Sequence, residues 1–125
     1  MSDPRFRPAD CTEEPAGFGK IETLRWKSLE EIAATLTPEV HEEERVRTAT
    51  AFLGAAQYQH RYARRIRARM NAKNHNAKSY AAVAGLRYDR LVKVLRGHAI
   101  MRLEDIAAAD SILGHISEFS AEAST

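Results

Sequence analysis

The residues with the clearest chemical potential in this sequence are the basic side chains between Gln57 and Arg102. That stretch holds twelve Lys and Arg residues against one acid, Asp89, so its formal charge is +11. The whole chain carries only +2, which leaves −9 for the remaining residues. Because a solvated helical surface ordinarily mixes both signs, this segregation indicates a polyanionic partner such as a nucleic acid. The basic residues are Arg61, Arg64, Arg65, Arg67, Arg69, Lys73, Lys78, Arg87, Arg90, Lys93, Arg96 and Arg102.

Catalytic or metal chemistry has little support in the residue types. The five histidines are spread over separate predicted elements, and none is paired with another ligand at metal spacing. There is no glycine-rich phosphate loop, and the acidic run 42–44 suits the positive end of a helix better than a metal ion. The single Cys11 excludes an internal disulfide, and Glu13 and Glu14 beside it should raise its pKa. We therefore expect no enzyme activity, no metal and no cofactor.

Two short predicted helices would position the basic residues. Ala77–Ala84 is rich in helix formers, and Gly85 should end it because glycine accepts the left-handed conformation without steric cost. A second helix should run from Tyr88 to about Arg96 and stop at Gly97. The spacing of the inward residues is that of a DNA-binding helix-turn-helix, although an ordinary helical hairpin with a glycine turn is the alternative on this pattern alone. These core residues are Tyr80, Ala81, Ala84, Gly85, Leu86, Leu91 and Val94.

The same residues resemble the lambda-repressor-like (Cro/XRE) family of helix-turn-helix regulators, over about residues 58–114. The chain departs from the family pattern at Ser79, where a Glu would usually close a capping box with Asn76, and at Met101, where Pro is common. The resemblance implies a symmetric homodimer on a near-palindromic DNA site. The matching residues are Tyr80-Ala81, Gly85-Leu86, Leu91, Val94 and Arg96-Gly97, with Leu103, Ile106, Ala109 and Leu113 at the positions of a following packing helix.

The expected function is sequence-specific binding of double-stranded DNA by a transcriptional regulator, with repression as the expected sense. A helix over residues 88–95 has the right length to lie in the major groove, where Arg can bind guanine and Asp can accept from cytosine. The base-reading candidates are Arg87, Tyr88, Asp89, Arg90, Val92 and Lys93, with a phosphate contact as the alternative for Arg90. Lys78 and Ser79 would hold a phosphate at the N-terminus of the preceding helix, and Arg96, His98 and Arg102 would flank the groove on the DNA backbone.

The rest of the sequence predicts an all-α fold. Ser28 and Glu31 form a capping box that starts a helix over Leu29–Leu36. Thr37-Pro38 should start a second helix, and no clear stop signal follows before Lys73. Gly54 could divide this helix into two. A closing helix is expected over Leu103–Ile116. Apolar spacing places one stripe along the long helix: Ala49, Phe52, Ala56, Gln59, Ala63, Ile66 and Met70.

The domain organisation follows from composition. Residues 1–20 contain three of the four prolines and should be disordered or loosely packed. Residues 21–56 should form acidic N-terminal helices that dimerise through the Phe52 stripe, residues 57–117 the helix-turn-helix domain, and residues 118–125 a frayed end. An alternative is an antitoxin or adaptor whose helices in 21–56 bind a protein partner. With no apolar run of membrane-spanning length and no signal-peptide pattern, we expect no membrane and a cytoplasmic location, nucleoid-associated when bound to DNA.

Overall fold

The computed structural model describes residues 6–36 and 41–117, and within them the chain is all-α, with no strand and one isolated bridge between Thr12 and Trp26. The α-helices are α1 (Leu29–Ala33), α2 (Glu42–Ala72), α3 (Ala77–Ala84), α4 (Tyr88–Leu95) and α5 (Leu103–Ile112). Two short 3-10 turns, η1 (Pro8–Cys11) and η2 (Pro15–Gly17), precede them.

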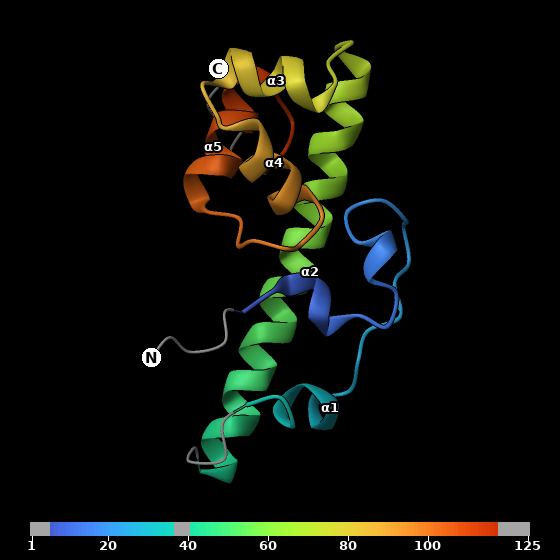
Figure 1. Cartoon of the computed structure of the whole chain (residues 1–125), viewed down its shortest axis with the longest axis vertical. Helices are drawn as coiled ribbons and strands as arrows, with labels where there is room; N and C mark the ends of the chain where they lie inside the picture. Colours follow the sequence, from blue (N-terminus) through green and yellow to red (C-terminus); the bar gives the residue numbers. More distant parts are fainter. Residues whose placement is uncertain (1–5, 37–40, 118–125) are drawn as a thin grey trace.

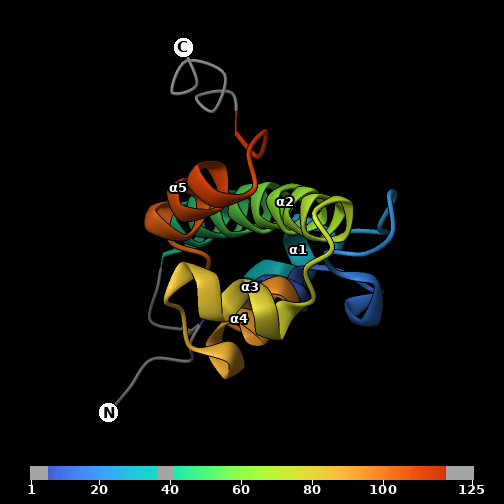
Figure 2. The same ribbon diagram turned by 90° about the horizontal axis from the view of Figure 1, so that it is seen from above.

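The long helix α2 is the axis of the molecule (Figure 1). Its C-terminal half carries α3, α4 and α5, and its N-terminal half carries η1 and α1. Seen from above, α3 and α4 form one layer, and α5 and α2 form another (Figure 2). Gly54 lies inside α2 without interrupting it, so α2 is a single helix of 31 residues. The predicted start signal at residues 37–38 lies outside the described residues.

The predicted stripe along α2 is confirmed as its inward face. Six of its seven members are buried, and Phe52 is half-buried. The expectation that its Ala49–Ala56 part is free to pair with a second copy is wrong, because the chain covers it itself. Ile32 of α1 and Cys11 pack on Ala49 and Ala56, and the Phe6 ring stacks on Phe52 with centroids 4.2 Å apart.

The prediction of a disordered or loosely packed segment before residue 21 is also wrong for residues 6–20. Ala9 and Phe18 are each only 1% exposed. The Ala9 N–H donates to the Gly97 carbonyl at 2.9 Å, and the Gly19 N–H donates to Nδ1 of His60 at 2.8 Å. Proline stands at the start of both 3-10 turns, where its fixed φ suits a tight turn. In residues 6–20, the prolines therefore belong to regular tight turns and do not mark a disordered segment.

The helices predicted at 77–84 and 88–95 are confirmed, and so is the turn between them. Gly85 has φ +70°, and the Leu86 N–H donates to the Ala81 carbonyl at 2.9 Å, which closes the left-handed cap of α3. Ser79 completes a capping box after all, since its Oγ accepts from the Asn76 N–H at 3.0 Å and its own N–H donates to Asn76 Oδ1 at 2.8 Å.

The helices at the two ends are shorter than predicted. The box formed by Ser28 and Glu31 is present, but α1 ends at Ala33. Helix α5 ends at Ile112, before Gly114 turns the chain at φ +76°, although Leu113 and Ile116 beyond it remain buried. Leu103, the first residue of α5, is 86% exposed.

Candidate nucleic-acid interface

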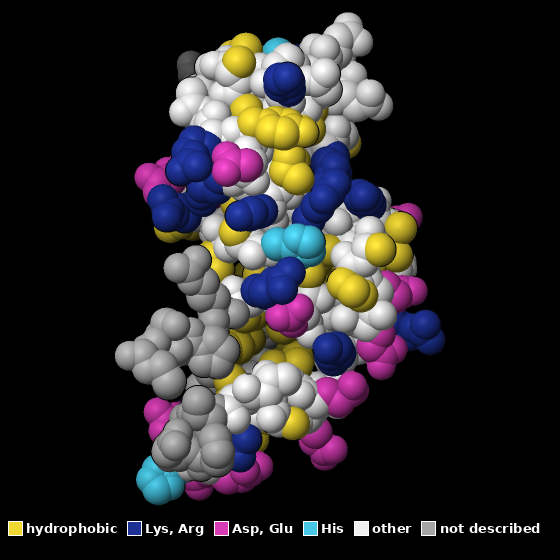
Figure 3. All heavy atoms as spheres, viewed as in Figure 1, with side chains coloured by type: hydrophobic (Ala, Val, Ile, Leu, Met, Phe, Trp, Pro, Cys, Tyr) yellow, Lys and Arg dark blue, Asp and Glu magenta, His cyan; other side chains and the backbone are white. Residues whose placement is uncertain are grey.

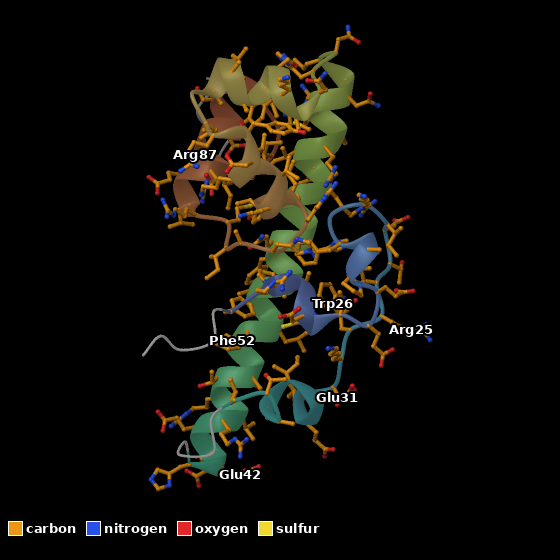
Figure 4. The ribbon with its side chains drawn as sticks, viewed as in Figure 1. Arg25, Trp26, Glu31, Glu42, Phe52 and Arg87 are labelled. Atoms are coloured by element: carbon orange, nitrogen blue, oxygen red, sulfur yellow. The ribbon has the colours of Figure 1, made fainter. Side chains whose placement is uncertain are left out.

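Helix α4 lies at the surface with one buried face and one outward face. Leu91, Val94 and Leu95 are each at most 5% exposed and anchor it to α2 and its neighbours. The outward face is formed by Tyr88, Asp89, Lys93 and Arg96, preceded by Arg87. Arg87 lies at the outer edge of the part that holds α3 and α4, far from Glu31 and Glu42 at the opposite end of α2 (Figure 4). An elongated partner could contact this outward face without disturbing the core.

Arg90 was predicted to contact a DNA base, but its side chain is bound to an acid within the protein. Its Nη1 and Nη2 donate to the two carboxylate oxygens of Asp105, each at 2.8 Å, and the Arg102 N–H donates to Oδ2 at 2.8 Å. Burial alone would raise the pKa of Asp105, but these hydrogen bonds and the Arg90 charge hold it below its ordinary value. Arg90 therefore fixes α4 against α5 instead of reaching outward.

Arg87 and Asp89 form an ion pair of a different kind. Their side chains are 3.4 Å apart and are 82% and 64% exposed. A pair this exposed contributes little to stability, about 0–1 kcal/mol. Both side chains can therefore leave each other for a ligand at small cost. Of the other predicted readers, Tyr88 and Lys93 are exposed and Val92 is half-buried.

Four of the five side chains predicted to contact phosphates are exposed, and the fifth, Ser79, is already hydrogen-bonded within the protein. Lys78, Arg96 and His98 are exposed. The Arg102 side chain is also exposed, at 65%, with Glu104 3.9 Å away. The Ser79 hydroxyl is occupied by its cap and by Nδ1 of His75 at 2.9 Å, so the prediction that it holds a phosphate is not supported by its geometry.

Gln59 positions the end of α4 and was missed as a functional residue by sequence reasoning. Its Nε2 donates to the carbonyls of Val94 and Ala99 at 2.9 and 2.8 Å, and its Oε1 accepts from the Met101 N–H at 2.8 Å. One buried amide thus fixes the connector between α4 and α5. The only signal in the sequence was a polar residue on an otherwise apolar stripe.

The surface charge is divided along the molecule. On the face that presents α4, most Lys and Arg side chains lie over the half with α3 and α4, while Asp and Glu dominate the other half (Figure 3). Besides Arg90, two further basic residues have structural roles. Arg65 donates to the Ile116 carbonyl at 2.8 Å, and Arg69 Nη2 donates to that of Leu113 at 3.0 Å, so both hold the segment after α5.

The described residues offer no metal site and no membrane span. They contain no group of three or more His, Cys, Asp or Glu placed to hold an ion. No described helix is both long and apolar enough to cross a bilayer. The Cys11 thiol is buried, and burial, with the Asp10 charge second, raises its pKa to about 11. The sequence predicted the direction of this shift but assigned it to Glu13 and Glu14.

Comparison with known proteins adds no relative. The chain matches no protein-family model, no curated protein and no solved structure.

Proposed function

We propose that this protein is a transcriptional regulator that binds double-stranded DNA, with α3 and α4 acting as a helix-turn-helix. The observation that supports this most strongly is the outward face of α4. An eight-residue helix, held by three buried side chains, exposes Tyr88, Asp89 and Lys93 on the half of the molecule where most Lys and Arg side chains gather (Figure 3). A helix of this size fits the major groove, and its N-terminal turn would meet the base edges.

The side chains then divide by role. Arg87, Tyr88, Asp89 and Lys93 read bases, with Val92 at the edge of that set. Lys78, at the start of α3, and Arg96, His98 and Arg102, beyond the end of α4, contact phosphates. Arg90 and Gln59 position the reading helix, and Ser79 caps the preceding helix α3. Apart from the half-buried Val92, this assignment keeps the base-reading role on exposed residues.

We also propose that two copies bind one site, since a single small module makes few base contacts. The stripe around Phe52 is covered, so another surface must pair. A groove of about 710 Å³ lies between α2, the connector and α5, with Tyr58, Ile100 and Leu103 at its edge, exposed by 66%, 52% and 86%. An exposed apolar cluster of this kind beside the DNA-reading half is suited to an isologous contact with a second copy.

The alternative is an adaptor or antitoxin whose N-terminal helices bind another protein. The observation that favours it is a second set of exposed apolar side chains on the acidic half. Ile21, Leu29 and Val46 are 42%, 38% and 45% exposed. A partner bound there would leave α4 free, so both activities can coexist in one chain.

Selection from a random pool of duplexes tests the DNA proposal. A regulator of this kind enriches one near-palindromic motif. If about six phosphates are contacted, the slope of log affinity against log salt should be near −5 to −6, from roughly −0.9 per phosphate. Enrichment of no motif together with an affinity that does not change with salt would exclude DNA binding.

A further inference from the structure

Arg67 of α2 is held in an unusual place between the loop after η2 and the end of α4. Its Nε is buried and has no hydrogen-bond partner in the described part of the chain. A Cβ added at Gly19 would lie 3.5 Å from that Nε and 2.4 Å from the Leu95 carbonyl oxygen. The stem of Arg67 is therefore fixed by close backbone, and its guanidinium is directed by packing rather than by an acid.

Arg96 directly follows Leu95 in the chain. A Cβ added at Gly19 would lie beside both the Leu95 carbonyl oxygen and the Arg67 Nε, so the Arg67 side chain reaches the end of α4 that carries Arg96. Burial lowers the pKa of Arg67, and the positive charge of Arg96 lowers it further. Among the described residues neither arginine has an ion-pair partner. Two arginines at one end of a helix with no acid between them repel each other, and an anion bound by both relieves the repulsion.

Two carbonyls at the end of α4, those of Lys93 and Val94, already accept hydrogen bonds from other donors. The Gly97 and His98 N–H groups donate to the carbonyls of Val94 and Lys93, and Gln59 donates to Val94 as well. With those acceptors satisfied, the arginines dominate the local charge. The planar fork of a guanidinium matches the oxygens of a phosphate, so a pair of forks can enclose one phosphate group.

We propose that Arg67 and Arg96 together form a site for a single phosphate group. The assignment of that group to the DNA backbone rests on the proposed function, and it adds to the interface a residue from α2 that lies outside the helix-turn-helix. Free inorganic phosphate would occupy the same site more weakly, since it lacks the other contacts of a duplex.

The test compares Arg67→Gln, Arg96→Gln and the double variant in binding to the selected duplex over a salt series. Because both side chains share one phosphate, each single variant should bind severalfold more weakly, and even the double variant should reduce the salt slope by about one unit. Arg47→Gln, an exposed position in the acidic half of α2, serves as the control and should bind like the parent. A slope reduced by two units in the double variant, or an unchanged slope, would overturn the shared site.

A second measurement needs no DNA and separates the two proposals. Phosphate stabilises proteins in general by exclusion from their surfaces, so the measured quantity is its rise in melting temperature over sodium chloride at equal ionic strength. This rise should be larger in the parent than in Arg67→Gln. If no duplex binds but this difference is seen, the proposed function fails and the phosphate site stands. If the parent and Arg67→Gln respond alike to phosphate, the site fails whatever the DNA result.

Discussion

Both guanidinium Nη atoms of Arg90 bind the two carboxylate oxygens of Asp105, each at 2.8 Å, and this pair joins α4 to α5. Asp105 is 8% exposed and the Arg90 side chain 29%, so the pair is shielded from much of the solvent. The orientation of the proposed reading helix thus depends on an acid in the next helix.

Replacing that acid should loosen the reading helix. Asp105→Asn removes the charge and leaves Arg90 without its partner, so the free energy of unfolding should fall by roughly 1–3 kcal/mol. Urea unfolding at pH 7 measures this. Asp89→Asn, at an exposed pair, should change stability by less than about 0.5 kcal/mol. Equal losses in the two variants would contradict the structural role of Asp105.

His60 should make the protein less stable in mild acid. Its Nδ1 accepts the Gly19 N–H, and burial together with the Arg64 charge lowers its pKa below the ordinary value. Because the pKa of His60 is lower in the folded state, its full contribution to the free energy of unfolding is present above the pKa of the unfolded chain, about 6.5. That contribution declines as the pH falls below this value. The slope for one proton is at most about 1.4 kcal/mol per pH unit.

Urea unfolding between pH 5 and 7.5 measures this dependence. The quantity compared is the slope of the free energy of unfolding against pH, which does not change if a substitution lowers stability equally at every pH. His60→Gln should flatten the profile, whereas His98→Gln, at an exposed position, should keep the parent's slope. The same decline in His60→Gln as in the parent would place the responsible group elsewhere.

Two glycines should respond to substitution with opposite signs. Gly85 has φ +70° with open space around it, so Gly85→Val should cost about 1–2 kcal/mol from conformation alone. Gly54 lies within α2, also with open space, so Gly54→Ala should add about 0.5–1 kcal/mol. Thermal unfolding of both variants measures these two changes in stability. A Gly85→Val protein that melts like the parent would contradict the left-handed turn.

The proposed dimer surface can be tested at its most exposed side chain. Leu103→Glu would bury a charge in the contact and should weaken self-association about tenfold or more, as measured by sedimentation. Val46→Glu is the matched control on the acidic half of the chain. A dimer lost in Val46→Glu and kept in Leu103→Glu would place the contact on the N-terminal half instead.

The local features of the fold were predictable because neighbouring residues determine them. The glycine turn at Gly85, the box at Ser28 and the stripe along α2 each follow from propensity or periodicity over a few residues. The charge segregation that suggests DNA is likewise a property of composition along the chain.

The remaining features depend on contacts between distant segments, which one sequence does not reveal. Arg90 was assigned to a base because its partner comes 15 residues later, in another helix. Gln59 bridges to residues 35 to 42 positions away. The stripe around Phe52 was expected to be free because the segment that covers it, which begins at Phe6, carries the prolines that usually mark disorder.

The central claim is that the outward face of α4 reads sequence, and Arg87→Ala tests it most directly against Lys78→Ala. Binding of both variants would be measured to the selected duplex and to a scrambled duplex over a salt series. Arg87→Ala should lose roughly 1–3 kcal/mol on the selected duplex alone and relax the choice at one base pair. Lys78→Ala should weaken both duplexes alike and reduce the salt slope by about one unit, since a phosphate contact carries no sequence information. Equal weakening of both duplexes by Arg87→Ala would contradict the account.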